Sequence, residues 1–256
     1  MAGRAIWKGY IHLGGVDVPV KLHTAVREER VQFHLLHRRD QVKLKQQMVC
    51  AHENVPVPAE EQARGVELEE GRYLLVDPEE LDQADPEESR LIEVHEFVKN
   101  GEIDPVFLER AYYLEPDAPS KGYSALVGAL GEMDVAGICT WAMRKRSYLG
   151  ALQTSGRSLR LCTLRYADEV LSVASLEMPE TPLAEKELRI GTELINQLTA
   201  PFQPQKFEDE HQKKLRQLID RKARGEKIAI LRPRRLKPTA SDKLLHALEA
   251  SLKKVA

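Results

Sequence analysis

The sequence predicts an α+β protein that is mainly β, with its strands first and its helices last. Over residues 7–166, apolar side chains repeatedly occupy every second position, which is the period of a half-buried strand. These runs are short, and little helical pattern separates them. Beyond Pro182 the apolar residues recur every three or four positions, as on one face of a helix. The pattern therefore predicts an antiparallel barrel or sandwich that is followed by helices.

The N-terminal residues are predicted to form a β-hairpin. Residues 7–13 and 16–22 each alternate apolar with polar side chains, and Gly14-Gly15 separates the two runs. A glycine pair between alternating runs is a strong signal for a two-residue hairpin turn. Residues 31–36 and 42–49 are predicted to be two further strands.

The middle of the chain is predicted to hold a loop, two short helices and several strands. Residues 51–71 are the loop, because Pro, Glu and Gly dominate them. Pro78 is expected to open a brief helical turn, since its fixed φ suits the first helical position. A helix over residues 123–130 should be short, because glycines surround it. The strands are expected at residues 72–76, 91–98, 112–114, 135–143, 148–153 and 159–166.

Two amphipathic helices are predicted after the strands. The first covers residues 183–198, with an apolar face that includes Ile190, and Pro201 ends it. The second covers residues 206–224, and Gly225 is a suitable stop.

The last residues are predicted to be a basic linker and a short helix. Arg232-Pro233-Arg234-Arg235 indicates an extended basic linker, and Ser241 is a suitable N-cap for the helix. The leucines of that helix either dock on a partner or close the core. We expect three regions: a barrel core at 4–182, a helical arm at 183–225, and the linker with its terminal helix at 226–256.

Charge is unevenly distributed along the chain, although the net charge is only -2. Residues 1–50 hold nine Lys and Arg against four Asp and Glu, and residues 205–256 hold fifteen against seven. Residues 51–119 hold five against twenty. Such segregation favours a basic surface for an acidic partner on an otherwise acidic body, although a charge run can also be a solvated face.

The sequence offers little support for an enzyme. It has no phosphate-binding loop of the Walker type, no dinucleotide fingerprint and no Gly-x-Ser-x-Gly elbow. His95-Glu96 resembles the start of a zinc-protease motif, but Lys99 stands where the second histidine belongs. The three cysteines lack the paired spacing of a four-thiolate zinc site. We therefore expect no catalytic residue, no metal and no cofactor.

Several short segments, in their order along the chain, resemble the prokaryotic Ku proteins of non-homologous end joining. The resemblance extends from about residue 4 to residue 225. The segments that carry it are Ala5-Ile6-Trp7-Lys8-Gly9, residues 16–22, Phe33-His34-Leu35-Leu36-His37, residues 43–45, residues 92–98, Ile103-Asp104-Pro105, residues 112–117, Arg144-Lys145-Arg146 and residues 163–169.

The resemblance implies a β-barrel core with a bridging segment and a C-terminal helical arm. Two subunits would form a ring around the ends of linear double-stranded DNA and recruit ligase D, an ATP-dependent DNA ligase. Many members of that family carry Cys-x-x-Cys-Gly near Cys50, where this chain reads Cys50-Ala51-His52-Glu53-Asn54. A metal role for that loop is therefore doubtful here.

Seven cations are predicted to line the DNA channel. Lys and Arg bind phosphates without reading the base sequence, because their affinity comes from the release of condensed counterions. The chosen residues lie on or beside strands predicted for the barrel and bridge: Lys8, Lys21, Lys43, Lys45, Arg144, Lys145 and Arg146.

The sequence also indicates a cellular compartment and leaves two alternative functions open. The N-terminus lacks the apolar core of a signal peptide, and no apolar run is long enough to span a membrane. We expect a soluble protein of the cytoplasm, associated with the nucleoid. The alternatives are an adaptor that binds only proteins and a hydrolase that uses the early histidines, such as His34 and His37.

Overall fold

The computed structural model describes residues 4–86, 89–178 and 184–226. The chain divides into two compact units, one of residues 1–28 and 34–175 and one of residues 29–33 and 176–256. In the described part, no helix is long and apolar enough to cross a membrane.

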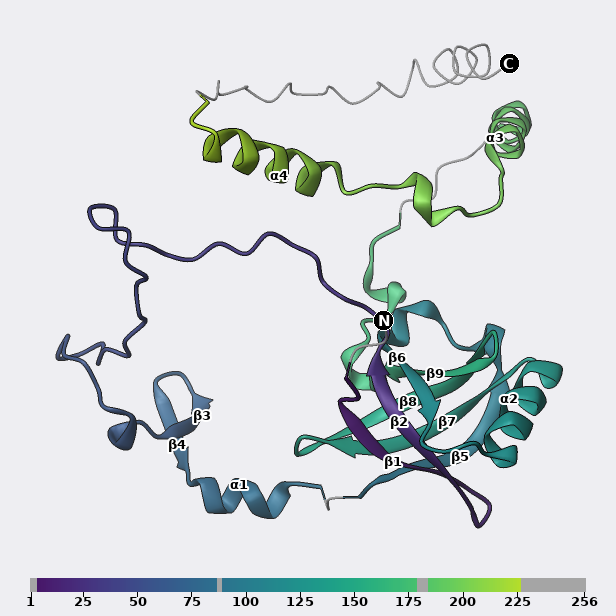
Figure 1. Cartoon of the computed structure of the whole chain (residues 1–256), viewed down its shortest axis with the longest axis horizontal. Coiled ribbons are helices and arrows are strands. Elements are labelled where there is room, and N and C mark those ends of the chain that lie inside the picture. Colours follow the sequence, from purple (N-terminus) through teal and green to yellow (C-terminus); the bar gives the residue numbers. More distant parts are fainter. Residues whose placement is uncertain (1–3, 87–88, 179–183, 227–256) are drawn as a thin grey trace. The chain divides into compact units, whose positions relative to one another are not determined.

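Seven strands of the first unit close into a β-barrel (Figure 1). Their spatial order is β1-β2-β6-β9-β8-β7-β5. The strands are β1 (Trp7–Leu13), β2 (Val16–Thr24), β5 (Leu91–Lys99), β6 (Leu108–Pro116), β7 (Val135–Met143), β8 (Arg146–Ser155) and β9 (Ser158–Leu164). The predicted N-terminal hairpin is confirmed, and the strands predicted at 135–143, 148–153 and 159–166 are present as β7, β8 and β9, which form a meander.

The prediction of an antiparallel barrel is only partly right, because β1 pairs with β5 in parallel. The other six neighbouring pairs are antiparallel. An odd number of strands cannot alternate in direction all the way round a closed barrel, so at least one neighbouring pair must be parallel. A parallel pair also needs a long connection between its strands, whereas an antiparallel pair needs only a hairpin. β2 and residues 25–90 supply that connection here.

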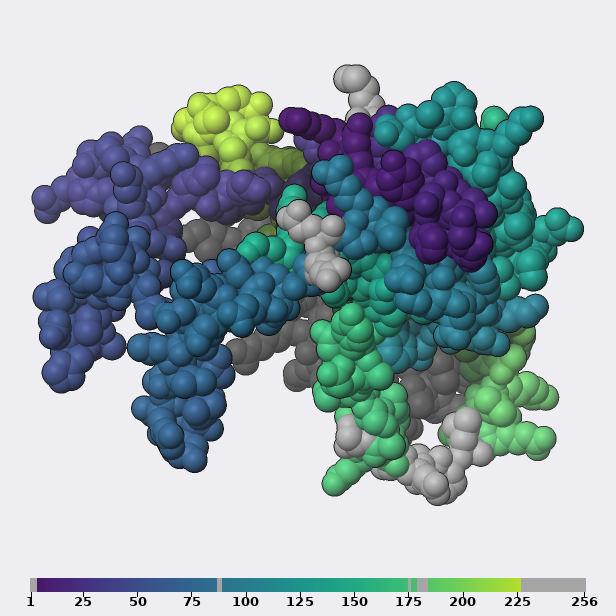
Figure 2. Space-filling view, turned by 90° about the horizontal axis from the view of Figure 1, so that it is seen from below, coloured from purple at the N-terminus to yellow at the C-terminus, as the bar shows by residue number. Residues whose placement is uncertain are grey.

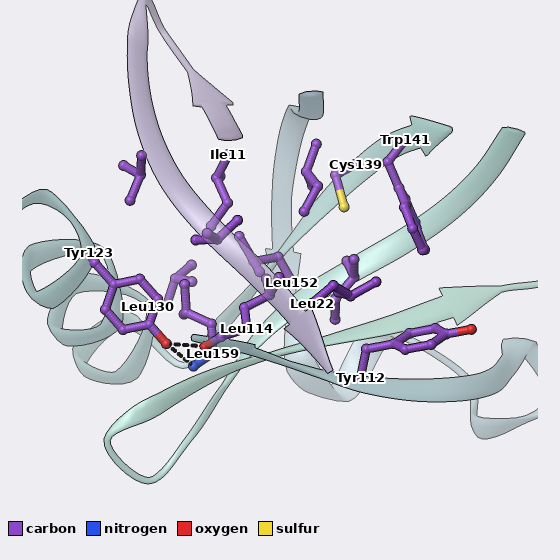
Figure 3. Close-up of a cluster of buried hydrophobic side chains, with 14 of the residues drawn as sticks. Ile11, Leu22, Tyr112, Leu114, Tyr123, Leu130, Cys139, Trp141, Leu152 and Leu159 are labelled. Carbon is purple, nitrogen blue, oxygen red and sulfur yellow. Dashed lines mark hydrogen bonds between the residues drawn. The ribbon is translucent and has the colours of Figure 1, made fainter. Parts of the chain in front are cut away.

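The core lies inside the barrel, as the alternating pattern predicts. Figure 3 shows Ile11, Leu114 and Leu152 in the cluster of buried side chains, and all three are fully buried. One helix, α2 (Lys121–Met133), packs on β7 and β8 and is longer than predicted. Its Tyr123 hydroxyl donates to the carbonyl oxygen of Leu114 at 2.5 Å and accepts from the amide of Leu159 at 2.9 Å. These two bonds tie the helix to β6 and β9.

Residues 25–90, which join β2 to β5, are called the connecting segment below. It contains β3 (Arg64–Glu69), β4 (Arg72–Val76) and α1 (Pro78–Ala84). The strand at 72–76 and the helix at Pro78 are confirmed, whereas part of the predicted loop at 51–71 forms β3. None of the described residues of this segment is buried.

The two strands predicted at 31–36 and 42–49 are wrong. Only isolated bridges form there, between Leu36 and Lys43 and between Val49 and Pro56. Each bridge closes a narrow turn of the segment on itself. The alternation reports local backbone preference, but a strand also needs a partner strand, and within the described residues these stretches form only the two isolated bridges.

The second unit contains α3 (Glu185–Leu198) and α4 (Glu210–Ala223), so both predicted helices are confirmed. Gly225 has a φ of +80° just beyond α4, which is the left-handed conformation of a helix stop. The predicted terminal helix, with the basic linker from residue 227 onwards, lies outside the described residues. Short 3₁₀ turns lie at Ala59–Glu61, Asn100–Glu102, Pro105–Phe107, Ala167–Glu169, Val173–Ser175 and Pro204–Lys206.

Candidate nucleic-acid interface

The seven predicted cations fall at three places in the first unit. Lys8 and Lys21 lie on β1 and β2, and Lys43 and Lys45 lie in the connecting segment. Of the remaining three, Arg144 and Lys145 form the turn from β7 to β8, and Arg146 is the first residue of β8. The fold thus brings together the members of each group.

Lys8 and Lys21 face each other across the β1–β2 ladder and share one carboxylate. The Oδ1 atom of Asp117 lies 2.7 Å from the Nζ of Lys21 and 3.7 Å from that of Lys8. The hydrogen bond to Asp117 raises the pKa of Lys21, and it holds the pKa of Asp117 below its usual value. Figure 2 shows the hairpin of β1 and β2, in purple, at the surface of the molecule. The Lys8 side chain is 62% exposed and that of Lys21 is 25% exposed, so the pair is accessible to a ligand that competes with Asp117.

Lys43 and Lys45 lie in the connecting segment but on no strand, because the strand predicted at 42–49 does not form. They flank Leu44, whose amide donates to the carbonyl oxygen of Leu35 at 2.9 Å. Both lysines are exposed, and neither forms an ion pair with any residue that the structure describes. The bridge between Leu36 and Lys43 holds this turn in shape.

The turn from β7 to β8 has two residues, because Met143 pairs with Arg146. Its residues Arg144 and Lys145 have φ values of 53° and 62°. Positive φ at both central positions is the signature of a type I′ turn, which usually takes Asn and Gly. A residue with a Cβ in this region costs about 1–2 kcal/mol. Two cations therefore occupy strained positions at the tip of a hairpin.

Lys145 differs from its neighbours because two carboxylates of the connecting segment surround its ammonium group. The Nζ atom lies 2.5 Å from Asp82 and 2.8 Å from Asp85. Hydrogen bonds to Asp82 and then to Asp85 raise the pKa of Lys145 well above its ordinary value, and Lys145 lowers the pKa of Asp82. In the described part of the chain, neither Arg144 nor Arg146 has such a carboxylate partner.

The early histidines do not converge on one site. His12 pairs with Asp17 at 2.7 Å, His23 with Glu115 at 2.8 Å and His37 with Asp40 at 2.9 Å. Across residues 4–86, 89–178 and 184–226, no three His, Cys, Asp or Glu side chains form a group able to hold a metal ion. His95 lies on β5, so the segment that resembles a zinc-protease motif is a strand, as expected.

Comparison with known proteins decides the family. Residues 12–190 match the family model described as the Ku70/Ku80 beta-barrel domain. The chain belongs to the Ku family. A relative named non-homologous end joining protein Ku 2, from Geotalea uraniireducens strain Rf4, is 72% identical over the full length of both chains. The Ku protein of Solibacter usitatus strain Ellin6076 is 34% identical over 97% of this chain and 92% of its own. Protein Ku of Mycobacterium phage Omega is 32% identical over 98% of this chain and 86% of its own.

The Ku match covers the whole of β2 and β5–β9, and the names of these relatives carry no enzyme activity. The sequence alone did not indicate that Asp82, Asp85 and Asp117 contact three of the predicted cations. Asp117 follows β6 directly, so only the register between β2 and β6 reveals that it lies beside Lys21. Asp82 and Asp85 lie in the acidic stretch of residues 51–119, which the charge pattern indicated only as part of an acidic body.

Proposed function

We propose that this protein binds the ends of linear double-stranded DNA as a ring-shaped homodimer in non-homologous end joining. The observation that carries the proposal is its membership of the Ku family over residues 12–190, together with relatives named for that repair process. The proposed role is to hold the ends, without chemistry of its own, for a separate ATP-dependent DNA ligase, ligase D.

The exposed cations support contact with the phosphate backbone. We assign the phosphate contacts to Lys8, Lys21, Lys43, Lys45, Arg144 and Arg146. Lys43, Lys45, Arg144 and Arg146 are exposed and free of ion pairs with the described residues. Phosphate contacts position a protein on the duplex and carry no direct sequence information. Selectivity for ends then comes from the closed ring, because a duplex without ends cannot enter it.

Apolar side chains along the connecting segment support a second copy of the chain as partner. Leu35, Met48 and Leu75 are 72%, 67% and 68% exposed. The pair β3–β4 is a separate two-stranded sheet, and such a sheet is marginally stable by itself. Exposed apolar surface of this extent marks an interaction site. In a homodimer the two connecting segments would cover each other's apolar side chains and complete the ring.

The decisive experiment compares linear duplex with the same DNA as a covalently closed circle. The proposal expects retardation of the linear form only, and protein loaded on linear DNA should stay trapped when the ends are then ligated. Affinity should fall by about a thousandfold or more between 50 and 200 mM salt if six phosphates are contacted. Equal binding of linear and circular DNA, or a stable monomer in solution, contradicts the ring. Absence of any duplex binding favours the protein adaptor instead.

The C-terminal helices are proposed to contact the ligase. The α3 helix exposes Leu188, Ile195 and Leu198, and the rings of Phe202 and Phe207 stack at 6.0 Å just beyond it. An exposed amphipathic helix presents side chains spaced for a groove on a protein partner. Replacing Leu188 and Ile195 by Gln should abolish capture of purified ligase D while duplex binding is retained. Loss of DNA binding together with ligase capture would argue against a separate ligase surface.

A further inference from the structure

Lys145 contacts carboxylates that belong to a distant part of the sequence. Its Nζ lies between Asp82, in the last turn of α1, and Asp85, the residue that caps the end of α1. More than 55 residues separate these partners along the chain. The contact therefore joins the connecting segment to the hairpin of β7 and β8.

A cation is favourable at the C-terminal end of α1. Carboxylates there lie next to the negative end of the helix dipole, which disfavours them. The last turn of α1 carries no basic residue of its own, and its two acidic residues at the first turn, Glu79 and Glu80, are at the favourable end. Lys145 supplies the missing positive charge from a different element.

The strand register brings the same two regions together. Ile92, near the start of β5, pairs with Trp141, near the end of β7. Asp85 precedes β5 by six residues and Lys145 follows β7 by two, so both lie close to this point of the ladder. The left-handed φ of Lys145 places its side chain in a strained turn, and strained positions persist when surrounding contacts hold them.

We propose that Lys145 is an anchor and not a phosphate contact. It holds the C-terminal end of α1, in the part of the connecting segment that leads into β5, against the barrel. This inference rests on the proposed function, since the connecting segment is the part that would surround the DNA. Lys145 is then a positioning residue for the ring. Its neighbours Arg144 and Arg146 remain available to the backbone of the duplex.

A test without DNA uses a glutamate-specific protease, whose cleavage after Glu79 or Glu80 reports how often α1 opens. Asn tolerates the left-handed conformation, so Lys145→Asn removes the charge and keeps the turn, and Arg144→Asn is the matched control in the same turn. The anchor predicts cleavage about tenfold faster for Lys145→Asn and unchanged for the control. A Lys145→Asn protein cleaved at the wild-type rate overturns the proposal.

Charge exchange tests whether the anchor is electrostatic. Lys145→Asp by itself should also accelerate cleavage in α1. Combining it with Asp82→Lys and Asp85→Lys should restore slow cleavage, because opposite charges face each other again. Cleavage as fast in the triple variant as in Lys145→Asp contradicts the ion-pair anchor.

Duplex binding separates the anchor from a phosphate contact. The double variant Asp82→Asn and Asp85→Asn frees Lys145. If Lys145 positions the segment, this variant binds duplex more weakly, as Lys145→Asn does, with the salt dependence unchanged. If Lys145 binds phosphate, the double variant binds more tightly, and the inference is wrong. If even the wild-type protein fails to bind duplex, the proposed function fails, whereas the protease result still decides the anchor.

Discussion

The barrel and the connecting segment both carry alternating apolar residues, but only the barrel buries them. Ile11, Leu114 and Leu152 are fully buried, whereas Leu35 and Met48 are largely exposed. In the barrel each strand has hydrogen-bonded neighbours on both sides, and in residues 34–57 the chain pairs only with itself in narrow turns. The difference teaches that an alternating pattern predicts burial only where partner strands are present, and these apolar residues of the connecting segment stay exposed in the single chain.

The largest contrast should appear in stability. Leu152→Ala removes a fully buried side chain and should lower the unfolding free energy by about 2–5 kcal/mol in a urea titration. Leu35→Ala should change it by less than about 0.5 kcal/mol at low protein concentration, because Leu35 is exposed in the single chain. In a dimer it should instead weaken self-association, which sedimentation equilibrium measures. Equal destabilisation by both changes would remove the distinction between the two regions.

The sequence predicted most barrel strands well, because most of them pair with a strand that is close to them in the sequence. The period-two runs of β1, β2 and β7–β9 each meet a neighbour close in sequence, so pattern and pairing agree. The parallel pair of β1 and β5 depends on closure of the whole barrel, which no local pattern reports. The strands predicted at 31–36 and 42–49 failed for the opposite reason, since within the described residues they have no partner strand and form only isolated bridges.

The candidate site was predicted by residue type and not by environment. The sequence selected seven cations by charge and by place along the chain, and their contact with DNA stays a prediction. It did not find Asp117 beside Lys21, or Asp82 and Asp85 beside Lys145, because those contacts depend on register and on a long connection. Charge totals over long stretches conceal such pairs, since an acidic stretch can supply the partners of isolated lysines.

The thiol of Cys50 in the connecting segment should be alkylated faster than the buried thiol of Cys139 in the barrel. Burial raises the pKa of Cys139 in the barrel to about 12, whereas backbone amides of Glu53 and His52 lower the pKa of Cys50 in the connecting segment. The thiolate is the reactive form, so at pH 8 Cys50 should be alkylated at least about a hundredfold faster than Cys139. Mass spectrometry of iodoacetamide-treated protein measures both rates. Similar rates in the folded protein would mean that the barrel opens readily.

The raised pKa of Cys139 also makes the free energy of unfolding depend on pH. The unfolded thiol loses its proton near its ordinary pKa of 9, while the folded thiol keeps it up to about 12. The folded state therefore binds more protons in this range, and stability falls as pH rises from 9 towards 12. Cys139→Ala should remove that part of the decline, which urea titrations at several pH values will detect.

Reversing the lysines of the connecting segment should weaken duplex binding without affecting the fold. Lys43→Glu with Lys45→Glu should lower affinity by about tenfold or more, equally for different sequences, and reduce the salt slope by about two. Both residues are exposed, so unfolding and self-association should stay unchanged. Lys121→Glu, an exposed lysine at the start of α2, is the control. Loss of binding for only one DNA sequence would contradict a backbone contact.

The smallest expected effect, and the only gain, concerns Asp117. Its carboxylate forms ion pairs with Lys21 and Lys8. The carboxylate stays ionised at neutral pH, because the pKa of Asp117 lies below its usual value. A phosphate that contacts these lysines must compete with it, so Asp117→Asn should raise duplex affinity by a few fold and make the salt dependence steeper. Asp17→Asn, whose partner is His12 on the same hairpin, should leave both unchanged. Weaker binding by Asp117→Asn would instead mean that the carboxylate holds the lysines in a binding geometry. The barrel lysines would then resemble Lys145, because their carboxylate would position them and not compete with DNA.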